Sequence, residues 1–199
     1  NYAAGKAQGD YLLFLNNDTE VITPDWIDAM VEQAQRLTIG AVGALLLYPN
    51  RLIQHAGVVL GVDSVAGHSH RCFLPNALGY FGQIQTINNY SAVTGACLMC
   101  RREVFDTVGG FNEELAVAYN DVDLCLKMAK KGYKNIYTPS AVLYHYESMS
   151  RGYEDTNEKK IRFIKEREHM QKKWREFIDH DPCYSIHLTK LGEDYSLNV

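Results

Sequence analysis

The segment at residues 11–18 constrains the fold of this chain more than any other. Tyr11–Leu15 is an apolar run that ends abruptly in Asn16, Asn17 and Asp18, of which only Asp18 carries a carboxylate. This pattern is typical of a buried strand that delivers one metal-binding oxygen to the rim of a sheet. Open α/β sheets bind ligands beyond the carboxyl ends of their strands, so Asp18 is expected at a ligand-binding edge.

Composition narrows the class of protein. The 199 residues suffice for one domain with a sizeable core, and 46% hydrophobic with 22% charged residues is ordinary for a globular protein. A net charge of −4 gives no indication of nucleic-acid binding. The apolar stretches are far shorter than the ~20 residues of a membrane-spanning helix. No signal peptide is recognised at the start of the sequence, which does not begin with Met. We therefore expect a fragment of a longer protein.

The cysteines give no disulfide framework. Five are present, an odd number without regular spacing. The pair Cys97-x-x-Cys100 resembles a zinc or redox motif, but no second pair exists and the intervening residues are apolar. We therefore predict that both thiols are buried in a strand.

Strands and helices alternate along the chain, which predicts an α/β fold. The expected strands are Tyr11–Leu15, Ile39–Leu47, an extended Leu52–Leu60, Ser91–Cys100, Asn135–Thr138 and Ala141–Tyr146. The expected helices begin at Pro24 with Thr23 as cap, at Arg102 (to Val108), at Asn120 (to Gly132) and at about Asn157 (to Ile178). Residues 61–89 lack a clear period and are expected to form a long loop, which is often functional.

Asp18 is the first candidate for chemistry. Mg²⁺ and Mn²⁺ prefer oxygen ligands, which Asp18 could supply at the rim, with Asn16 and Asn17 adding neutral carbonyl oxygens. The alternative is a plain polar turn, because Asn and Asp favour turns for their own hydrogen bonds.

A second polar cluster begins the expected helix at 120. Asn120 is a good cap, and Asp123 three residues later resembles a weak capping box. Asp121 lies off the apolar face formed by Val122 and Leu126, in the first turn, where the helix dipole favours an ionised carboxylate. Asp121 is therefore either part of the cap or a general base.

His145 closes the last expected strand before a polar loop. A histidine there is either a buried core residue or a metal ligand at the rim. Three further histidines, His55, His68 and His70, surround the long loop and are possible acceptor-loop residues.

Several phrases together resemble the inverting family-2 glycosyltransferases of GT-A fold, in the correct order over nearly the whole chain. They are Gly-Asp-Tyr-Leu-Leu-Phe-Leu-Asn-Asn-Asp-Thr-Glu-Val (9–21), Thr-Pro-Asp-Trp-Ile (23–27), Ile-Gln-His-Ala-Gly-Val-Val-Leu-Gly (53–61), Val-Thr-Gly-Ala-Cys-Leu (93–98), Val-Gly-Gly-Phe-Asn-Glu (108–113), Tyr-Asn-Asp-Val-Asp-Leu-Cys-Leu (119–126) and Leu-Tyr-His-Tyr-Glu-Ser-Met-Ser-Arg-Gly (143–152). Within this family, the chain most resembles the bacterial O-antigen and rhamnan-type glycosyltransferases.

The resemblance implies roles for particular residues. Asn16-Asn17-Asp18 takes the place of the family's Asp-x-Asp motif, with Asp18 and His145 holding Mg²⁺ or Mn²⁺. Asp121 falls at the catalytic base. The small residues Gly95 and Ala96 fall beside the acceptor site, to which we also assign Asp123. Asn16 and Asn120 stand where the family has acidic residues, which removes formal charge from the site.

The implied reaction is metal-dependent transfer of a sugar, with inversion, from a nucleotide-diphosphate sugar to a saccharide or lipid-linked glycan, as in polysaccharide biosynthesis of the cell envelope. Two alternatives use the same residues: a non-catalytic carbohydrate-binding or scaffold domain, and a metal-dependent hydrolase. The donor sugar, hexosyl or rhamnosyl, is not specified.

The resemblance also implies an incomplete domain. The family's N-terminal nucleotide-binding strand–helix–strand units have no counterpart here, so residues 1–199 are expected to form a single partial glycosyltransferase domain that is poorly active alone. Within it, 157–199 is expected to be a C-terminal helix and tail.

The C-terminal helix has eight basic and four acidic residues over 157–178. It either packs with a solvated basic face or lies near anionic lipid, which would place a cytoplasmic enzyme peripherally at the inner face of the membrane.

Overall fold

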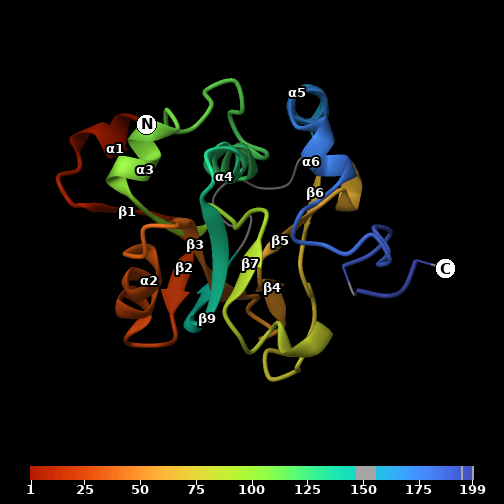
Figure 1. Cartoon of the computed structure of the whole chain (residues 1–199), viewed down its shortest axis with the longest axis horizontal. Coiled ribbons are helices and arrows are strands. Elements are labelled where there is room, and N and C mark those ends of the chain that lie inside the picture. The colour runs from red at the N-terminus through yellow and green to blue at the C-terminus, as the bar shows by residue number, and fades with distance from the viewer. Residues whose placement is uncertain (147–155, 194, 199) are drawn as a thin grey trace.

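The computed structural model describes residues 1–146, 156–193 and 195–198 and consists of a mixed sheet between helices (Figure 1). The strands are β1 (Tyr11–Leu15), β2 (Thr19–Val21), β3 (Ile39–Leu47), β4 (Ile53–His55), β5 (Val58–Leu60), β6 (Ala66–His68), β7 (Asn88–Tyr90), β8 (Cys97–Arg101) and β9 (Lys134–His145). The helices are α1 (Tyr2–Lys6), α2 (Trp26–Ala34), α3 (Arg102–Thr107), α4 (Asn120–Lys130), α5 (Asn157–Lys173) and α6 (Arg175–Asp179), with short 3-10 turns at Val62–Ser64 and Tyr80–Gly82.

The main sheet has the order β1-β8-β3-β9-β2, with β4 paired to β3 and β7 paired to β9. β3 and β9 are parallel, whereas β8 is antiparallel to both β1 and β3. β1, β3 and β9 therefore run in the same direction, and their carboxyl ends point toward one edge of the sheet. A separate hairpin of β5 and β6 lies beside the main sheet.

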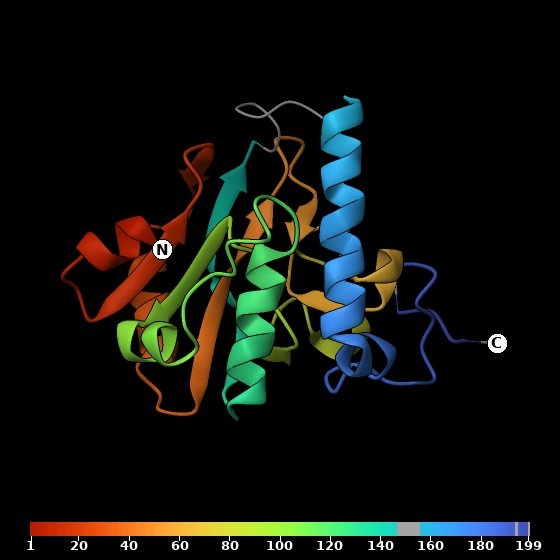
Figure 2. The same ribbon diagram turned by 90° about the horizontal axis from the view of Figure 1, so that it is seen from above.

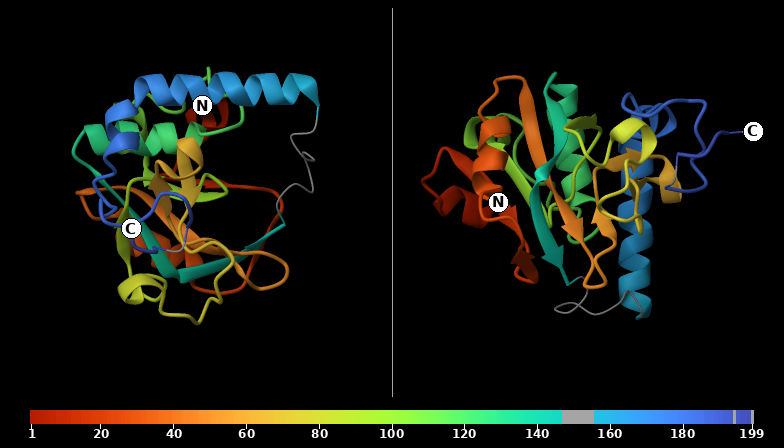
Figure 3. Two further views of the ribbon diagram at one scale, coloured as in Figure 1. Left: turned by 90° about the vertical axis from the view of Figure 1, so that its right-hand side faces the viewer. Right: turned by 90° about the horizontal axis from the view of Figure 1, so that it is seen from below.

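Both faces of the sheet are covered, which explains why all nine residues of β3 are buried. Successive side chains of a strand point to opposite faces. Val42 and Leu46 pack in one cluster with Trp26 and Met30 of α2, whereas Ala41 packs in another with residues of α4 and α6. Figure 2 shows α4 and α5 standing side by side on the face opposite α2, and Figure 3 shows α5 crossing that side of the molecule.

The predicted α/β class, with a mixed sheet flanked by helices, is confirmed. Tyr11–Leu15 and Ile39–Leu47 are strands with the predicted bounds, and the short helix after Arg101 is present. Cys97 and Cys100 are buried in β8, where burial raises the pKa of each thiol to about 12, as expected for structural cysteines. Among the described residues, no helix is both long and apolar enough to cross a membrane.

Several predicted helix ends were wrong. The helix predicted at Pro24 begins at Trp26 with Asp25 as cap, because Thr23 instead bonds through its hydroxyl to Ser140 O and through that oxygen to Val142 N. The helix α4 begins at Asn120 as predicted, but Asn120 is not its cap, since Tyr119 occupies that position and the Asn120 amide donates to Val117 O. The helix predicted over 157–178 is interrupted at Trp174, whose indole N–H donates to the Asp123 carboxylate of α4.

The strand predictions also needed correction. Leu52–Leu60 is two strands in different sheets, because Gly57 has φ +107° and the Tyr90 ring lies where a side chain would stand. The predicted loop 61–89 contains β6, which pairs with β5. Ser91–Cys100 is a strand only from Cys97, and residues 134–145 form one bulged strand instead of two. β2 was missed, because three residues carry too little periodicity to be recognised.

Candidate active site

The turn that follows β1 is held from both sides. Asn16 N donates to Ala96 O at 3.0 Å, and Asp18 O accepts from Tyr146 N at 2.8 Å. The Thr19 hydroxyl closes the turn by donating to Asn16 O at 2.9 Å. These bonds fix Asp18 at the end of the sheet, between the start of β8 and the end of β9.

His145 is the last residue of β9 and faces this turn. The register of β2 against β9 places it opposite Thr19, the neighbour of Asp18. As a result its Nε2 lies 3.2 Å from Asp18 Oδ1 and 3.1 Å from the side-chain nitrogen of Asn16. The structure thus brings together Asp18, Asn16 and His145, as the family resemblance predicted.

Gln54 fixes the orientation of His145. Gln54 Oε1 lies 2.6 Å from His145 Nδ1, and both side chains are buried. An amide oxygen accepts, so Nδ1 donates its proton to Gln54, and Nε2 is the ring nitrogen that faces Asp18 and Asn16. This arrangement, with the second ring nitrogen donating to a fixed oxygen, is typical of metal-binding histidines. Sequence reasoning missed Gln54, although it lies beside His55 in one of the phrases that carry the resemblance.

Asp121 lies at the start of α4 and is half-buried. Its Oδ2 accepts from Gly95 N at 2.7 Å, and its Oδ1 accepts from Val122 N at 2.8 Å. A carboxylate oxygen can accept more than one hydrogen bond, so each retains capacity for a further proton donor. Gly95 and Ala96 connect the two parts of the site, because one bonds Asp121 and the other bonds the turn at Asn16.

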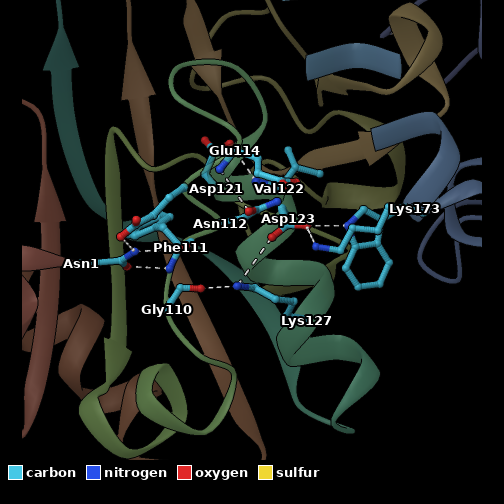
Figure 4. A network of polar contacts seen from close by, with 12 residues as sticks. Asn1, Gly110, Phe111, Asn112, Glu114, Asp121, Val122, Asp123, Lys127 and Lys173 are labelled. Carbon is cyan, nitrogen blue, oxygen red and sulfur yellow. Dashed lines mark hydrogen bonds and ion pairs between the residues drawn. The ribbon is translucent and has the colours of Figure 1, made fainter. Parts of the chain in front are cut away.

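Asp123 has a different environment from Asp121, as Figure 4 shows. It is fully buried, and its Oδ1 accepts from Lys173 Nζ at 2.7 Å and from Trp174 Nε1 at 2.8 Å. Lys127 Nζ is 3.6 Å from its Oδ2. The predicted capping box is therefore wrong, and the burial of this carboxylate argues against the acceptor contact that the sequence suggested for Asp123.

Of the three histidines at 55, 68 and 70, His55 and His70 are fully buried, and His55 lies next to Gln54 of the site. Burial, together with His68 and His145, lowers the pKa of His55 well below 6.5, so its ring is neutral. Its Nε2 accepts from Gly57 N at 3.3 Å and its Nδ1 lies 3.0 Å from His68 Nδ1. His55 thus supports the backbone next to Gln54, whereas His70 stacks on Tyr195.

The site offers two side chains for a cation. Among the described residues no group of three or more His, Cys, Asp or Glu side chains is arranged to hold a metal. Asp18 and His145 form a pair, and any further ligands would come from Asn side chains, water or substrate. Residues 147–152 of the last family phrase lie outside the described residues.

Comparison with known proteins identifies the class. Residues 1–173 match the family model described as glycosyltransferase like family 2, and the chain belongs to this family. The fold is of the GT-A type. The structure of GalNAc-T7 with UDP, GalNAc and Mn²⁺ superposes with a TM-score of 0.63 at 14% identity, over 89% of this chain and 35% of that one. The mannosyltransferase PcManGT from Pyrobaculum calidifontis, with GDP-Man and Mn²⁺, gives 0.55 at 18% identity, over 88% and 42%.

Three relatives by sequence are longer than this chain. The protein y4gI of Sinorhizobium fredii is 49% identical over 100% of the chain, which spans 22% of that protein. The O-antigen biosynthesis protein RfbC of Myxococcus xanthus is 45% identical over 76% of the chain and 12% of its own length. The N-acetylglucosaminyl-diphospho-decaprenol L-rhamnosyltransferase of Mycobacterium tuberculosis is 30% identical over 72% and 49%. The chain thus spans half or less of each of these relatives.

Proposed function

We propose that this chain carries the catalytic centre of a metal-dependent, inverting glycosyltransferase. The donor is a nucleotide-diphosphate sugar and the acceptor a hydroxyl of a saccharide or lipid-linked glycan. The observation that carries the proposal is the pairing of Asp18 with His145 at the end of the sheet, linked through Gly95-Ala96 to the carboxylate of Asp121. Membership of family 2 and the rhamnosyltransferase relative support it.

The Asp18–His145 pair suits a divalent cation. Asp18 Oδ1 and His145 Nε2 face each other at 3.2 Å while Nδ1 is bonded to Gln54, so both atoms could bind the same cation when Nε2 is unprotonated. Mg²⁺ is usually bound through one or two carboxylates, with the other positions left for water and substrate phosphates, so a two-residue site fits it. When bound, Mg²⁺ or Mn²⁺ would neutralise the charge that develops on the leaving diphosphate.

Asp121 is the general base in this proposal. Its two hydrogen bonds, to Gly95 N and Val122 N, hold the carboxylate while leaving it able to accept a proton. As the acceptor oxygen bonds to the anomeric carbon, its proton passes to Asp121 and the bond from that carbon to the diphosphate breaks on the opposite face. A single displacement inverts the configuration, so no nucleophile of the enzyme is required. General base catalysis contributes ~10²–10⁴-fold.

Gly95 provides space beside the base. A Cβ at this position would lie 3.3 Å from the Cβ of Asp121, closer than most side chains tolerate. The missing side chain therefore lets the Asp121 carboxylate come close enough to accept from Gly95 N. The acceptor-site role of Gly95 and Ala96 is proposed from the family resemblance.

The membrane association of the domain stays a prediction. α5 packs on the domain through buried Glu166 and Met170, while Ile161 and Ile164 on its outer side are 54% and 42% exposed. Two exposed apolar side chains between lysines are compatible with either solvent or a lipid surface. If the acceptor is lipid-linked, the enzyme would work at the inner face of the membrane.

The test is made on the full-length gene product that contains this chain. Asp18→Ala is expected to abolish transfer from nucleotide-diphosphate sugars in Mn²⁺, and Asp28→Ala, which removes an exposed carboxylate in α2, should leave it unchanged. Chelation of the metal should reproduce the loss in the unaltered protein. Undiminished, chelator-resistant transfer by Asp18→Ala would contradict the metal site.

The same assay separates the alternatives. Release of free sugar from the donor without transfer to any acceptor would indicate a hydrolase. Sugar binding without any turnover would indicate a carbohydrate-binding or scaffold domain.

A further inference from the structure

Helix α5 contacts the segment that leads into the proposed catalytic base at several points. The ring of Phe163 lies 5.8 Å from that of Tyr119, and His169 Nε2 lies 3.2 Å from the side-chain nitrogen of Asn112. At the end of α5, Lys173 and Trp174 bond Asp123 of α4. Figure 2 shows the later half of α5 beside α4, with the first turns of α5 extending beyond it. Contacts from α5 and its end therefore reach Asn112 and Tyr119 before Asp121 and Asp123 after it.

Glu166 makes the most specific of these contacts. It is 3% exposed, and its Oε2 and Oε1 accept from the successive amides of Ala118 at 2.7 Å and Val117 at 3.2 Å. Hydrogen bonds to an ionised acceptor are stronger than neutral ones, and a buried carboxylate requires such partners. Arg162 Nε, at 3.9 Å from Oε1, adds a weaker ion pair. One side chain thus holds two consecutive peptide groups of a loop.

The backbone immediately after these two amides has an unusual conformation. Tyr119 has φ +62°, in the left-handed region that side chains rarely adopt, and it caps the helix in which Asp121 is the second residue. Such conformations persist only where the surrounding structure enforces them. Glu166 fixes the two residues before Tyr119, and Phe163 packs on its ring. The direction in which α4 starts, and with it the position of Asp121, therefore depends on α5.

We propose that Glu166 is a positioning residue for Asp121. It does not touch the reacting atoms and leaves the proton transfer itself unchanged. By holding residues 117 and 118 it sets the entry into α4, so that the Asp121 carboxylate reaches Gly95 N on one side and the acceptor hydroxyl on the other. This inference rests on the proposed role of Asp121 as the base.

Kinetics of the full-length protein test the proposal. Glu166→Ala removes both bonds, whereas Glu166→Gln keeps one acceptor oxygen, so kcat for transfer should fall by ~10–100-fold in the first and less in the second. KM for the donor should stay within about twofold, because the contacts described for His145 are with Asp18, Asn16 and Gln54 and not with α5. Ile178→Val is the control, since it also removes buried contact but lies in α6, after the break at Trp174, and its side chain makes no hydrogen bond, so its kcat should be unchanged.

Amide hydrogen exchange supplies a second readout, because a general loss of stability speeds exchange throughout the core whereas a positioning effect speeds it at particular amides. In Glu166→Gln the amides of Val117 and Ala118 should exchange faster, and so should that of Gly95, which bonds only Asp121 and lies on a different segment. In Ile178→Val the exchange of Gly95 should match the unaltered protein. Faster exchange at 117 and 118 with unchanged exchange at Gly95 would overturn the proposal even if Glu166→Ala did not fold.

The outcomes also separate this inference from the proposed function. If Asp121→Asn leaves transfer intact, the base assignment fails, and the exchange of Gly95 still reports whether Glu166 positions Asp121. If Asp121→Asn abolishes transfer while both Glu166 variants keep normal kcat, only the positioning role is refuted.

Discussion

Replacing Asp121 by asparagine removes the proposed base with little change in shape. In the native site Oδ2 accepts from Gly95 N at 2.7 Å and Oδ1 from Val122 N at 2.8 Å. Asparagine has one acceptor oxygen, so it keeps one of the two bonds and turns its NH₂ group toward the other donor. Losing one partly exposed hydrogen bond costs ~1 kcal/mol of folding stability.

The expected effect on catalysis is much larger than this. A general base is worth ~10²–10⁴ in rate, which at 1.36 kcal/mol for each factor of ten equals about 2.7–5.4 kcal/mol of transition-state stabilisation. The variant should therefore fold nearly normally. Its rate of transfer should be about 1% of the normal rate or less. Donor affinity should change little, because the pair that would hold the metal lies on β9 and the turn after β1.

The assay is the initial rate of transfer in the full-length protein, with a thermal melt on the same preparation. Asp123→Asn provides the matched comparison, because the same substitution two residues later removes a buried charge bonded to Lys173 and Trp174. That variant should lose ~1–3 kcal/mol of stability through its unpaired lysine partners. Its kcat at a temperature where it is folded should exceed that of Asp121→Asn by at least about tenfold, since it retains the base.

The reverse pattern would refute the reasoning. Near-normal transfer in Asp121→Asn, together with a folded but inactive Asp123→Asn, would move the base to Asp123. The burial of Asp123 would then require α5 to move away during turnover.

Two further predictions concern space and pH. Gly95→Ala places a Cβ 3.3 Å from that of Asp121 and should displace the base. The rate of transfer should then fall several-fold while the melting temperature changes little. Equal rates for the unaltered protein and Gly95→Ala would show that Asp121 is not tightly packed against residue 95. Burial lowers the pKa of His70 from 6.5 to about 4, so the unfolded chain takes up the proton at higher pH than the folded one. The stability contributed by neutral His70 is complete above pH 6.5 and is lost as the pH falls toward about 4. Thermal melts across this range should show a smaller decline in His70→Gln, and identical declines would contradict the assignment.

The sequence predicts elements well where burial alone decides the structure. Ile39–Leu47 is apolar throughout because helices cover both faces of the sheet at β3, and its bounds follow directly from composition. β1 is predictable for the same reason. Asp18 and His145 each follow the end of an apolar run, so their positions at the rim are also local information.

The remainder depends on contacts between distant segments. Asn120 is a better capping residue than Tyr119, yet Tyr119 caps α4 because Glu166 and Phe163 of α5 hold the preceding loop. Local preference cannot anticipate a partner almost fifty positions away. Gln54 likewise belongs to no functional motif in the sequence. Its role becomes visible only in the fold, where β4 and β9 both pair with the end of β3 and Gln54 meets His145.

The short pairing of β2 with β9 has a consequence for how the protein folds. Asn16 and His145 lie 129 positions apart in sequence, and only three residue pairs join β2 to β9 at the margin of the sheet. The entropy of closing so long a loop must be overcome before its contacts contribute, so pairings of this kind form late. A partly folded chain could bury the core around β3 and still lack the Asp18–His145 pair. During refolding, the appearance of cation affinity would therefore mark the closing of this last strand pairing, later than the collapse of the hydrophobic interior.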